Sequence, residues 1–95
     1  MQLMITKSAL EWYKREMELS EGDCVRFYAR YGGDSNIQAG FSLGMMVEKP
    51  KEPTVQVINN GITFYVEHED EWYFDHHDLT VNYNNAHDEI EFQYN

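Results

Sequence analysis

The sequence has very little cysteine, and this scarcity limits the chemistry that one chain can carry. Its 95 residues include a single cysteine, Cys24, so no disulfide can form within the chain. A structural zinc site built from four cysteines of one chain is excluded for the same reason. The length suits one modest hydrophobic core, and we expect residues 1–95 to form a single domain.

Basic residues are also few. Seven lysines and arginines stand against 17 aspartates and glutamates, which gives a formal net charge of −10 at pH 7. This charge repels nucleic acids and anionic membrane surfaces, and it favours basic protein partners or cations. No apolar run approaches the roughly 18 residues that a membrane span needs, and no signal-peptide pattern is present. We therefore expect a cytoplasmic protein that binds neither nucleic acid nor membrane.

The motifs of the common enzyme classes are absent as well. The sequence contains no HExxH, phosphate-binding loop, GxSxG or GxGxxG, so hydrolase and nucleotide-binding functions have no support. No nucleophile stands at a recognisable spacing from a general base. We expect a protein that is not an enzyme; an enzyme that uses Asp34 or the histidine pair is the alternative with the least support.

One stretch near the start has the spacing of an amphipathic helix. Its apolar residues recur at helical intervals and form a stripe that consists of Leu10, Tyr13 and Met17. Thr6 or Ser8 can cap the first turn through a side-chain oxygen. The pattern predicts a helix over residues 7–19.

From residue 24 onward the pattern changes to alternation with period two, which is typical of strands. The alternating segments are Cys24–Tyr31, Phe41–Glu48, Thr54–Ile58, Ile62–His68, Leu79–Tyr83 and Ile90–Tyr94. Asn60 and Gly61 supply the positive-φ residues of a tight hairpin turn, and His68–Phe74 indicates a short acidic helix or turn. We predict an α+β fold, mostly β, in which the N-terminal helix packs on antiparallel strands of a compact domain.

A strand that runs into two glycines is the most distinctive stretch of the sequence. Residues 25–35 read Val-Arg-Phe-Tyr-Ala-Arg-Tyr-Gly-Gly-Asp-Ser, and the glycines allow a sharp end to the strand. The pattern Val-Arg-x-x-x-Arg-x-Gly-Gly-x-Ser resembles the signature of the HesB/IscA-like family, the A-type carriers of iron–sulfur cluster assembly. The resemblance covers nearly the whole chain and implies a compact β-rich domain with a helix near its start. We expect both arginines, Arg26 and Arg30, to bond nearby acids.

The sequence departs from that family where a cluster would be held. The family places its first cluster cysteine at the position of Asp34, and its C-terminal Cys-Gly-Cys has no counterpart here. The resemblance therefore implies a divergent member that has lost the cluster ligands, and we expect no cofactor. The candidate binding loop consists of Gly32, Gly33, Asp34 and Ser35. Aspartate offers hard oxygen, so iron or another divalent metal at Asp34 stays an alternative, beside a simple turn closed by these side chains.

Two adjacent histidines form a second candidate site. His76 and His77 lie between two aspartates, and together with Asp34 they are the candidate metal ligands. Adjacent histidines in an extended segment point to opposite faces, so a solvated acidic loop between two strands is the competing interpretation. Cys24 also has two interpretations: a thiol activated by Arg26, or an inert packing residue.

These observations lead to two hypotheses about function. In the first, implied by the resemblance, the protein is tied to iron–sulfur cluster biogenesis. It would be accessory or metal-binding without carrying a cluster, and its partners would be proteins of that assembly system. In the second, an acidic protein-interaction module reuses the scaffold for an unrelated role. Either protein would act as a monomer or a dimer.

Overall fold

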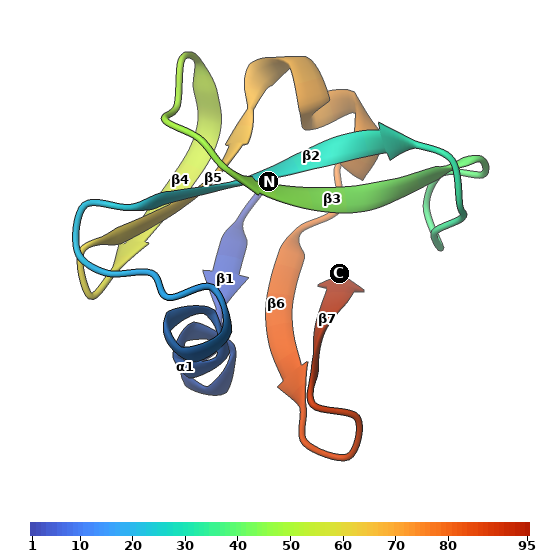
Figure 1. Ribbon diagram of the computed structural model, residues 1–95. Coiled ribbons are helices and arrows are strands. Elements are labelled where there is room, and N and C mark those ends of the chain that lie inside the picture. Colours follow the sequence, from blue (N-terminus) through green and yellow to red (C-terminus); the bar gives the residue numbers. More distant parts are fainter.

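The computed structural model describes all 95 residues and shows two β-sheets with one α-helix beside them (Figure 1). In chain order the elements are β1 (Leu3–Ile5), α1 (Lys7–Glu16), β2 (Cys24–Tyr31), β3 (Phe41–Val47), β4 (Pro53–Asn59), β5 (Ile62–Glu67), the 3₁₀ helix η1 (His68–Phe74), β6 (Leu79–Asn84) and β7 (Glu89–Tyr94). The mostly β, α+β fold predicted from the sequence is confirmed. No helix is long and apolar enough to cross a membrane.

The strand order explains how distant parts of the chain meet. The larger sheet has the order β3-β2-β5-β4, and the smaller has the order β1-β6-β7. Three pairs of consecutive strands, β2–β3, β4–β5 and β6–β7, are antiparallel, as predicted. The expected arrangement needs one correction, because each sheet also contains a parallel pair, β2 with β5 and β1 with β6. Parallel pairing requires a crossover connection, and the alternation within single strands does not reveal it.

Local sequence signals set the main boundaries. The hydroxyl oxygen of Thr6 accepts a hydrogen bond from the Ala9 N–H at 3.2 Å, so Thr6 is the residue that caps α1. The helix ends at Glu16, three residues earlier than predicted, and Glu18 adopts a left-handed φ of 52°. At the β4–β5 turn the expected positive-φ residues, Asn60 and Gly61, are both in that conformation.

The hydrophobic core takes side chains from both sheets, from α1 and from η1. Tyr13 of α1 is fully buried, and its ring centroid lies 5.1 Å from that of Phe64 on β5. Its hydroxyl donates to the sulfur of Met45 on β3 at 2.9 Å. Burial raises the pKa of Tyr13 well above its usual value. The predicted contact between the helical stripe and the strands is therefore present.

Replacement of Tyr13 with alanine tests this core. Tyr13→Ala should lower the free energy of unfolding by about 2–4 kcal/mol, because the buried ring leaves a cavity that the sheets cannot close. Chemical denaturation measures the change. Ile58→Ala on β4 is the control, since Ile58 is 62% exposed and its loss should cost no more than about 0.5 kcal/mol. Equal losses for the two variants would show that the core is assigned to the wrong residues.

Candidate functional site

The predicted binding loop connects β2 to β3 at the end of the larger sheet. Gly32 and Gly33 have φ values of 110° and 69°, which glycine adopts without strain, so the chain turns away directly after β2. The Asp34 carboxylate accepts a hydrogen bond from the Gly40 N–H at 2.9 Å, at the far end of the loop. One oxygen of Asp34 therefore bonds to the backbone of its own loop, as a turn-closing residue does.

Ser35 makes a second internal closure of the same loop. Its hydroxyl oxygen accepts from the Gln38 N–H at 3.1 Å and lies 3.2 Å from the Gln38 carbonyl, to which the hydroxyl donates. Both contacts lie within the loop, and neither side chain reaches another element through a hydrogen bond. This geometry fits the interpretation of Asp34 and Ser35 as turn residues.

The predicted metal ligands do not form one group. His76 and His77 follow η1, whereas Asp34 lies in the β2–β3 loop. Nowhere in the structure do three or more histidine, cysteine, aspartate or glutamate side chains assemble in an arrangement that could hold a metal ion. Asp75 and His76 adopt positive φ values of 46° and 68°, so the segment is a turn and not an extended strand.

Cys24 lies far from the candidate loop. It is the first residue of β2, half-buried, and its sulfur lies 4.0 Å from the Gly22 carbonyl oxygen. Asp34 follows the other end of the same strand, and at about 3.3 Å per residue β2 separates the two by roughly 20 Å. Cys24 therefore cannot share a ligand set with the loop of the same chain.

Arg26 bonds three carboxylates through its guanidinium group. Its guanidinium nitrogens donate to Glu48 at 2.8 Å, to Glu69 at 2.7 Å and to Asp70 at 2.8 Å. The Arg26 and Asp70 side chains are only 14% and 10% exposed, so this ion pair lies largely out of water. Burial alone would lower the pKa of Arg26, but the hydrogen bonds with Asp70, Glu48 and Glu69 raise it above its usual value. The expectation that this arginine bonds nearby acids is confirmed.

Arg30 behaves differently, because its Nε donates to the Ser42 hydroxyl at 3.1 Å and forms no ion pair. The two arginines of the signature therefore make different structural contacts. Arg26 joins β2 to η1 and to the segment after β3, whereas Arg30 only links β2 to β3.

Asp70 also compensates for a missing strand partner. The pairing of β2 with β5 ends at Phe27 and Val66, and the next part of β2 would expose unpaired N–H groups. The second carboxylate oxygen of Asp70 accepts a hydrogen bond from the Ala29 N–H at 3.2 Å. Asp70 thereby holds η1 against the end of β2 from which β5 has departed.

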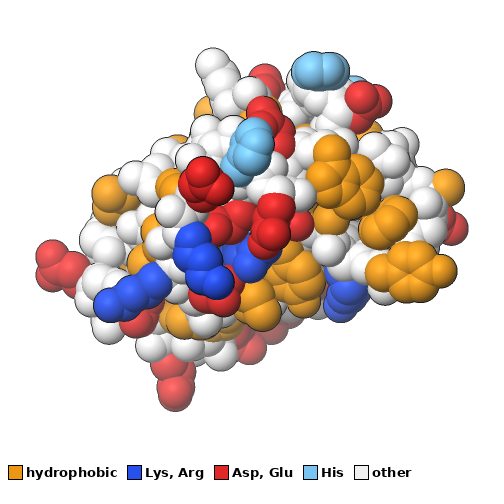
Figure 2. Space-filling model, turned by 90° about the horizontal axis from the view of Figure 1, so that it is seen from above, with side chains coloured by type: hydrophobic (Ala, Val, Ile, Leu, Met, Phe, Trp, Pro, Cys, Tyr) orange, Lys and Arg blue, Asp and Glu red, His pale blue; other side chains and the backbone are white.

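Three aromatic side chains lie together beyond this junction, and we call them the aromatic platform: Tyr31, Phe41 and Trp72. Tyr31 and Phe41 face each other in the β2–β3 register with ring centroids 5.6 Å apart, and the Phe41 and Trp72 centroids are 5.1 Å apart. Tyr31 is 86% exposed and Trp72 is 50% exposed. In the view of Figure 2, hydrophobic side chains gather on one side of the molecule, next to a dense group of charged side chains.

The platform was not predicted from the sequence. The pattern places Tyr31 and Phe41 in strands and makes Trp72 a possible anchor of the short acidic helix or turn, but it does not reveal which side chains are exposed together. One signal was present: Tyr31 continues the inward-facing alternation of Val25, Phe27 and Ala29 in the strand. A large aromatic at that position, immediately before the glycines, lies where the strand has passed the core.

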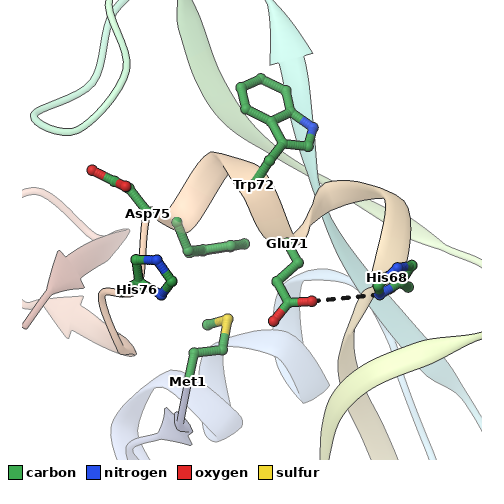
Figure 3. A pocket seen from close by; sticks show the side chains of 7 residues that line it. Met1, His68, Glu71, Trp72, Asp75 and His76 are labelled. Carbon is green, nitrogen blue, oxygen red and sulfur yellow. Dashed lines mark ion pairs between the residues drawn. The ribbon is translucent and has the colours of Figure 1, made fainter.

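A pocket of about 500 Å³ lies beside η1, and Trp72 is part of its lining. The pocket is lined by apolar and ionisable side chains, which are those of Met1, Trp72, Phe74, His68, Glu71, Asp75 and His76. The Glu71 carboxylate lies 3.4 Å from Nδ1 of His68 (Figure 3). Figure 3 also shows that the Trp72 indole points away from Met1 and Glu71. Trp72 thus belongs both to the lining of the pocket and to the platform, through its contact with Phe41.

Known proteins resemble this chain in sequence and in fold. A family model described as iron-sulphur cluster biosynthesis matches residues 1–95. A protein of Bacillus subtilis (strain 168) named pyruvate dehydrogenase inhibitor is 51% identical over 94 residues, which cover 99% of both chains. An uncharacterized protein of Staphylococcus saprophyticus is 35% identical over 95 residues, with 97% of each chain covered.

A solved structure adds a comparison of folds. The crystal structure of IscA with a [2Fe-2S] cluster matches with a TM-score of 0.59 and covers 99% of this chain and 81% of the other. The two sequences are only 12% identical in this alignment, so the match concerns the arrangement of the backbone.

Removal of the Arg26 side chain tests the junction between β2 and η1. Arg26→Ala should lower the free energy of unfolding by about 3–5 kcal/mol, since the buried Asp70 carboxylate loses its partner. Arg30→Ala is the matched control on the same strand, because Arg30 is exposed and bonds only to Ser42. Urea denaturation of both variants measures the difference. If Arg26→Ala unfolds at the same urea concentration as Arg30→Ala, the junction does not depend on Arg26.

Proposed function

The chain belongs to the iron-sulphur cluster biosynthesis family, the HesB/IscA family, and on that premise we propose that it is a member that binds a protein partner instead of carrying a cluster. The single observation that carries the proposal is the relative named pyruvate dehydrogenase inhibitor, which is 51% identical over almost the entire length of both chains. The proposed partner is the pyruvate dehydrogenase complex, and the proposed effect of binding is to lower its activity.

The donor atoms of the chain do not fit a bound iron–sulfur cluster. Clusters are held by cysteine thiolates, usually four for each cluster, and this chain has only Cys24. Asp34 stands at the family's cysteine position, but its oxygen is a poor ligand for sulfide-bridged iron. Cys24 and Asp34 also lie at opposite ends of β2, so a single chain cannot bring them to one cluster.

An inhibitor of this kind acts through its surface and needs no catalytic group. Two features support that role: the exposed aromatic platform and the strongly acidic character of the chain, with its net charge of −10. Interfaces are enriched in tyrosine and tryptophan, and a charged surface speeds association with a partner of opposite charge. The protein would act in the cytoplasm, in the same compartment as the complex that it binds.

Membership of the family favours a second candidate function. In this candidate the chain is an accessory protein of iron–sulfur cluster assembly and binds a protein of that system, with or without a divalent ion. The candidate ligands for such an ion are either Asp34 in the β2–β3 loop or His76 and His77 after η1, since the two places do not form one group. The match of the family model to residues 1–95 is the observation that favours it.

Anaerobic reconstitution separates a carrier from a protein without a cluster. After incubation with iron and sulfide followed by desalting, we expect the protein to retain no stoichiometric iron with matching acid-labile sulfide, because thiolates are lacking. Retention of both, abolished by Cys24→Ser, would contradict the loss of the carrier function. Retention of iron alone would support a mononuclear site and the second candidate. Asp34→Asn and His76→Ala would then be the first variants to compare.

An enzyme assay tests the proposed inhibition directly. The pyruvate dehydrogenase complex of B. subtilis is purified, and NADH formation from pyruvate is followed while this protein is added. We expect the rate to fall and to reach a plateau at a fixed ratio of protein to complex, as binding at defined sites requires. The B. subtilis relative is the positive control, and IscA, which shares the fold, is the negative control. An unchanged rate under conditions in which the relative inhibits would refute the proposal.

A further inference from the structure

The aromatic platform is the exposed apolar feature that the fold itself does not require. The other large hydrophobic residues with high exposure are Met4 on β1, Ile58 on β4, and Met46 and Val47 at the end of β3 opposite Phe41. Single exposed hydrophobic residues are normal on protein surfaces. Phe41 instead contacts both Tyr31 and Trp72 edge to face, and the three rings form a continuous apolar surface. Contiguous surfaces of this kind mark interaction sites.

The platform is also held in place before any partner binds. Tyr31 and Phe41 are opposite each other in the β2–β3 register, so the sheet fixes the backbone positions of both. Trp72 lies two residues after Asp70, whose carboxylate bonds both Arg26 and the Ala29 N–H. A surface that is already ordered loses little conformational entropy on binding, which favours affinity.

The charges beside Trp72 indicate the kind of partner. Trp72 borders the pocket of about 500 Å³, whose ionisable side chains are Glu71, Asp75, His68 and His76, with no lysine or arginine. The volume lies within the roughly 300–1,000 Å³ that is usual for ligand pockets, so a long basic side chain can enter it. A second copy of this chain is a poor occupant, because it also carries a net charge of −10 and would be repelled.

We propose that the platform and this pocket form one docking surface for a basic segment of a partner protein. An apolar side chain of the segment packs on Tyr31, Phe41 and Trp72, and a neighbouring lysine or arginine enters the pocket toward Glu71. The proposal rests on the proposed function in that it takes the pyruvate dehydrogenase complex as the protein that supplies the segment.

The test measures binding and inhibition separately with the purified complex of B. subtilis. Tyr31→Ser and Trp72→Ala remove two parts of the platform, and each should weaken binding about tenfold or more, as loss of an aromatic anchor does. Ile58→Ser is the matched control on β4, 62% exposed, and should bind within about twofold of the unaltered protein. Thermal unfolding checks that each variant is folded; Tyr31 is 86% exposed, so Tyr31→Ser decides the matter if Trp72→Ala unfolds.

Glu71→Gln tests the charged part of the surface without a change of shape. It should weaken binding several-fold at low salt, and the difference from the unaltered protein should shrink as salt is added, because salt screens the lost attraction. Equal binding by Glu71→Gln and the unaltered protein at low salt would overturn the basic character of the segment.

The outcomes distinguish this proposal from the proposed function. If the unaltered protein inhibits and the platform variants bind as Ile58→Ser does, the docking surface is wrong and the inhibition stands. If the platform variants lose binding but the bound protein does not slow the enzyme, the docking surface stands and the inhibitory function is wrong. If the unaltered protein does not bind the complex at all, both are wrong.

Discussion

The ion pair between Arg26 and Asp70 determines where η1 lies, and the exposed face beyond it depends on that position. One guanidinium group joins β2 to Glu48 after β3 and to Glu69 and Asp70 in η1. Asp70 uses its other oxygen on the backbone of β2, where the sheet has lost a strand. Such a charge is costly to bury alone, so the arrangement persists only while all its partners are in place. These contacts hold η1 against β2 and against the segment after β3.

The features that the sequence predicted are those with local causes. A hydroxyl at Thr6 caps the next turn, Asn60-Gly61 makes a tight turn, and alternation with period two forms strands within a few residues of their observed bounds. The parallel pairs could not be predicted, because the residue pattern within a strand does not indicate which other strand lies beside it. The contact between Arg26 and Asp70 spans 44 positions, so the site of η1 could be found only in the folded chain.

The candidate site shows the same division between local and long-range causes. The sequence selected Asp34 through its place in a family signature, and the structure finds that carboxylate bonded to the Gly40 N–H. The residues that face solvent, Tyr31 and Trp72, come from segments about forty positions apart and meet through Phe41. The backbone resembles that of IscA, although the sequences are 12% identical in their alignment. A shared backbone thus leaves the surface free to change its partner.

The pairing of β1 with β6 has a consequence for the way the chain is made. The Gln2 N–H donates to the Asp78 carboxylate across 76 positions, and Leu3 pairs with Leu79. β1 is synthesised first, but β6, its neighbour in the sheet, is synthesised much later. The first strand of the nascent chain must therefore wait without its partner, and the smaller sheet can close only after β6 has left the ribosome.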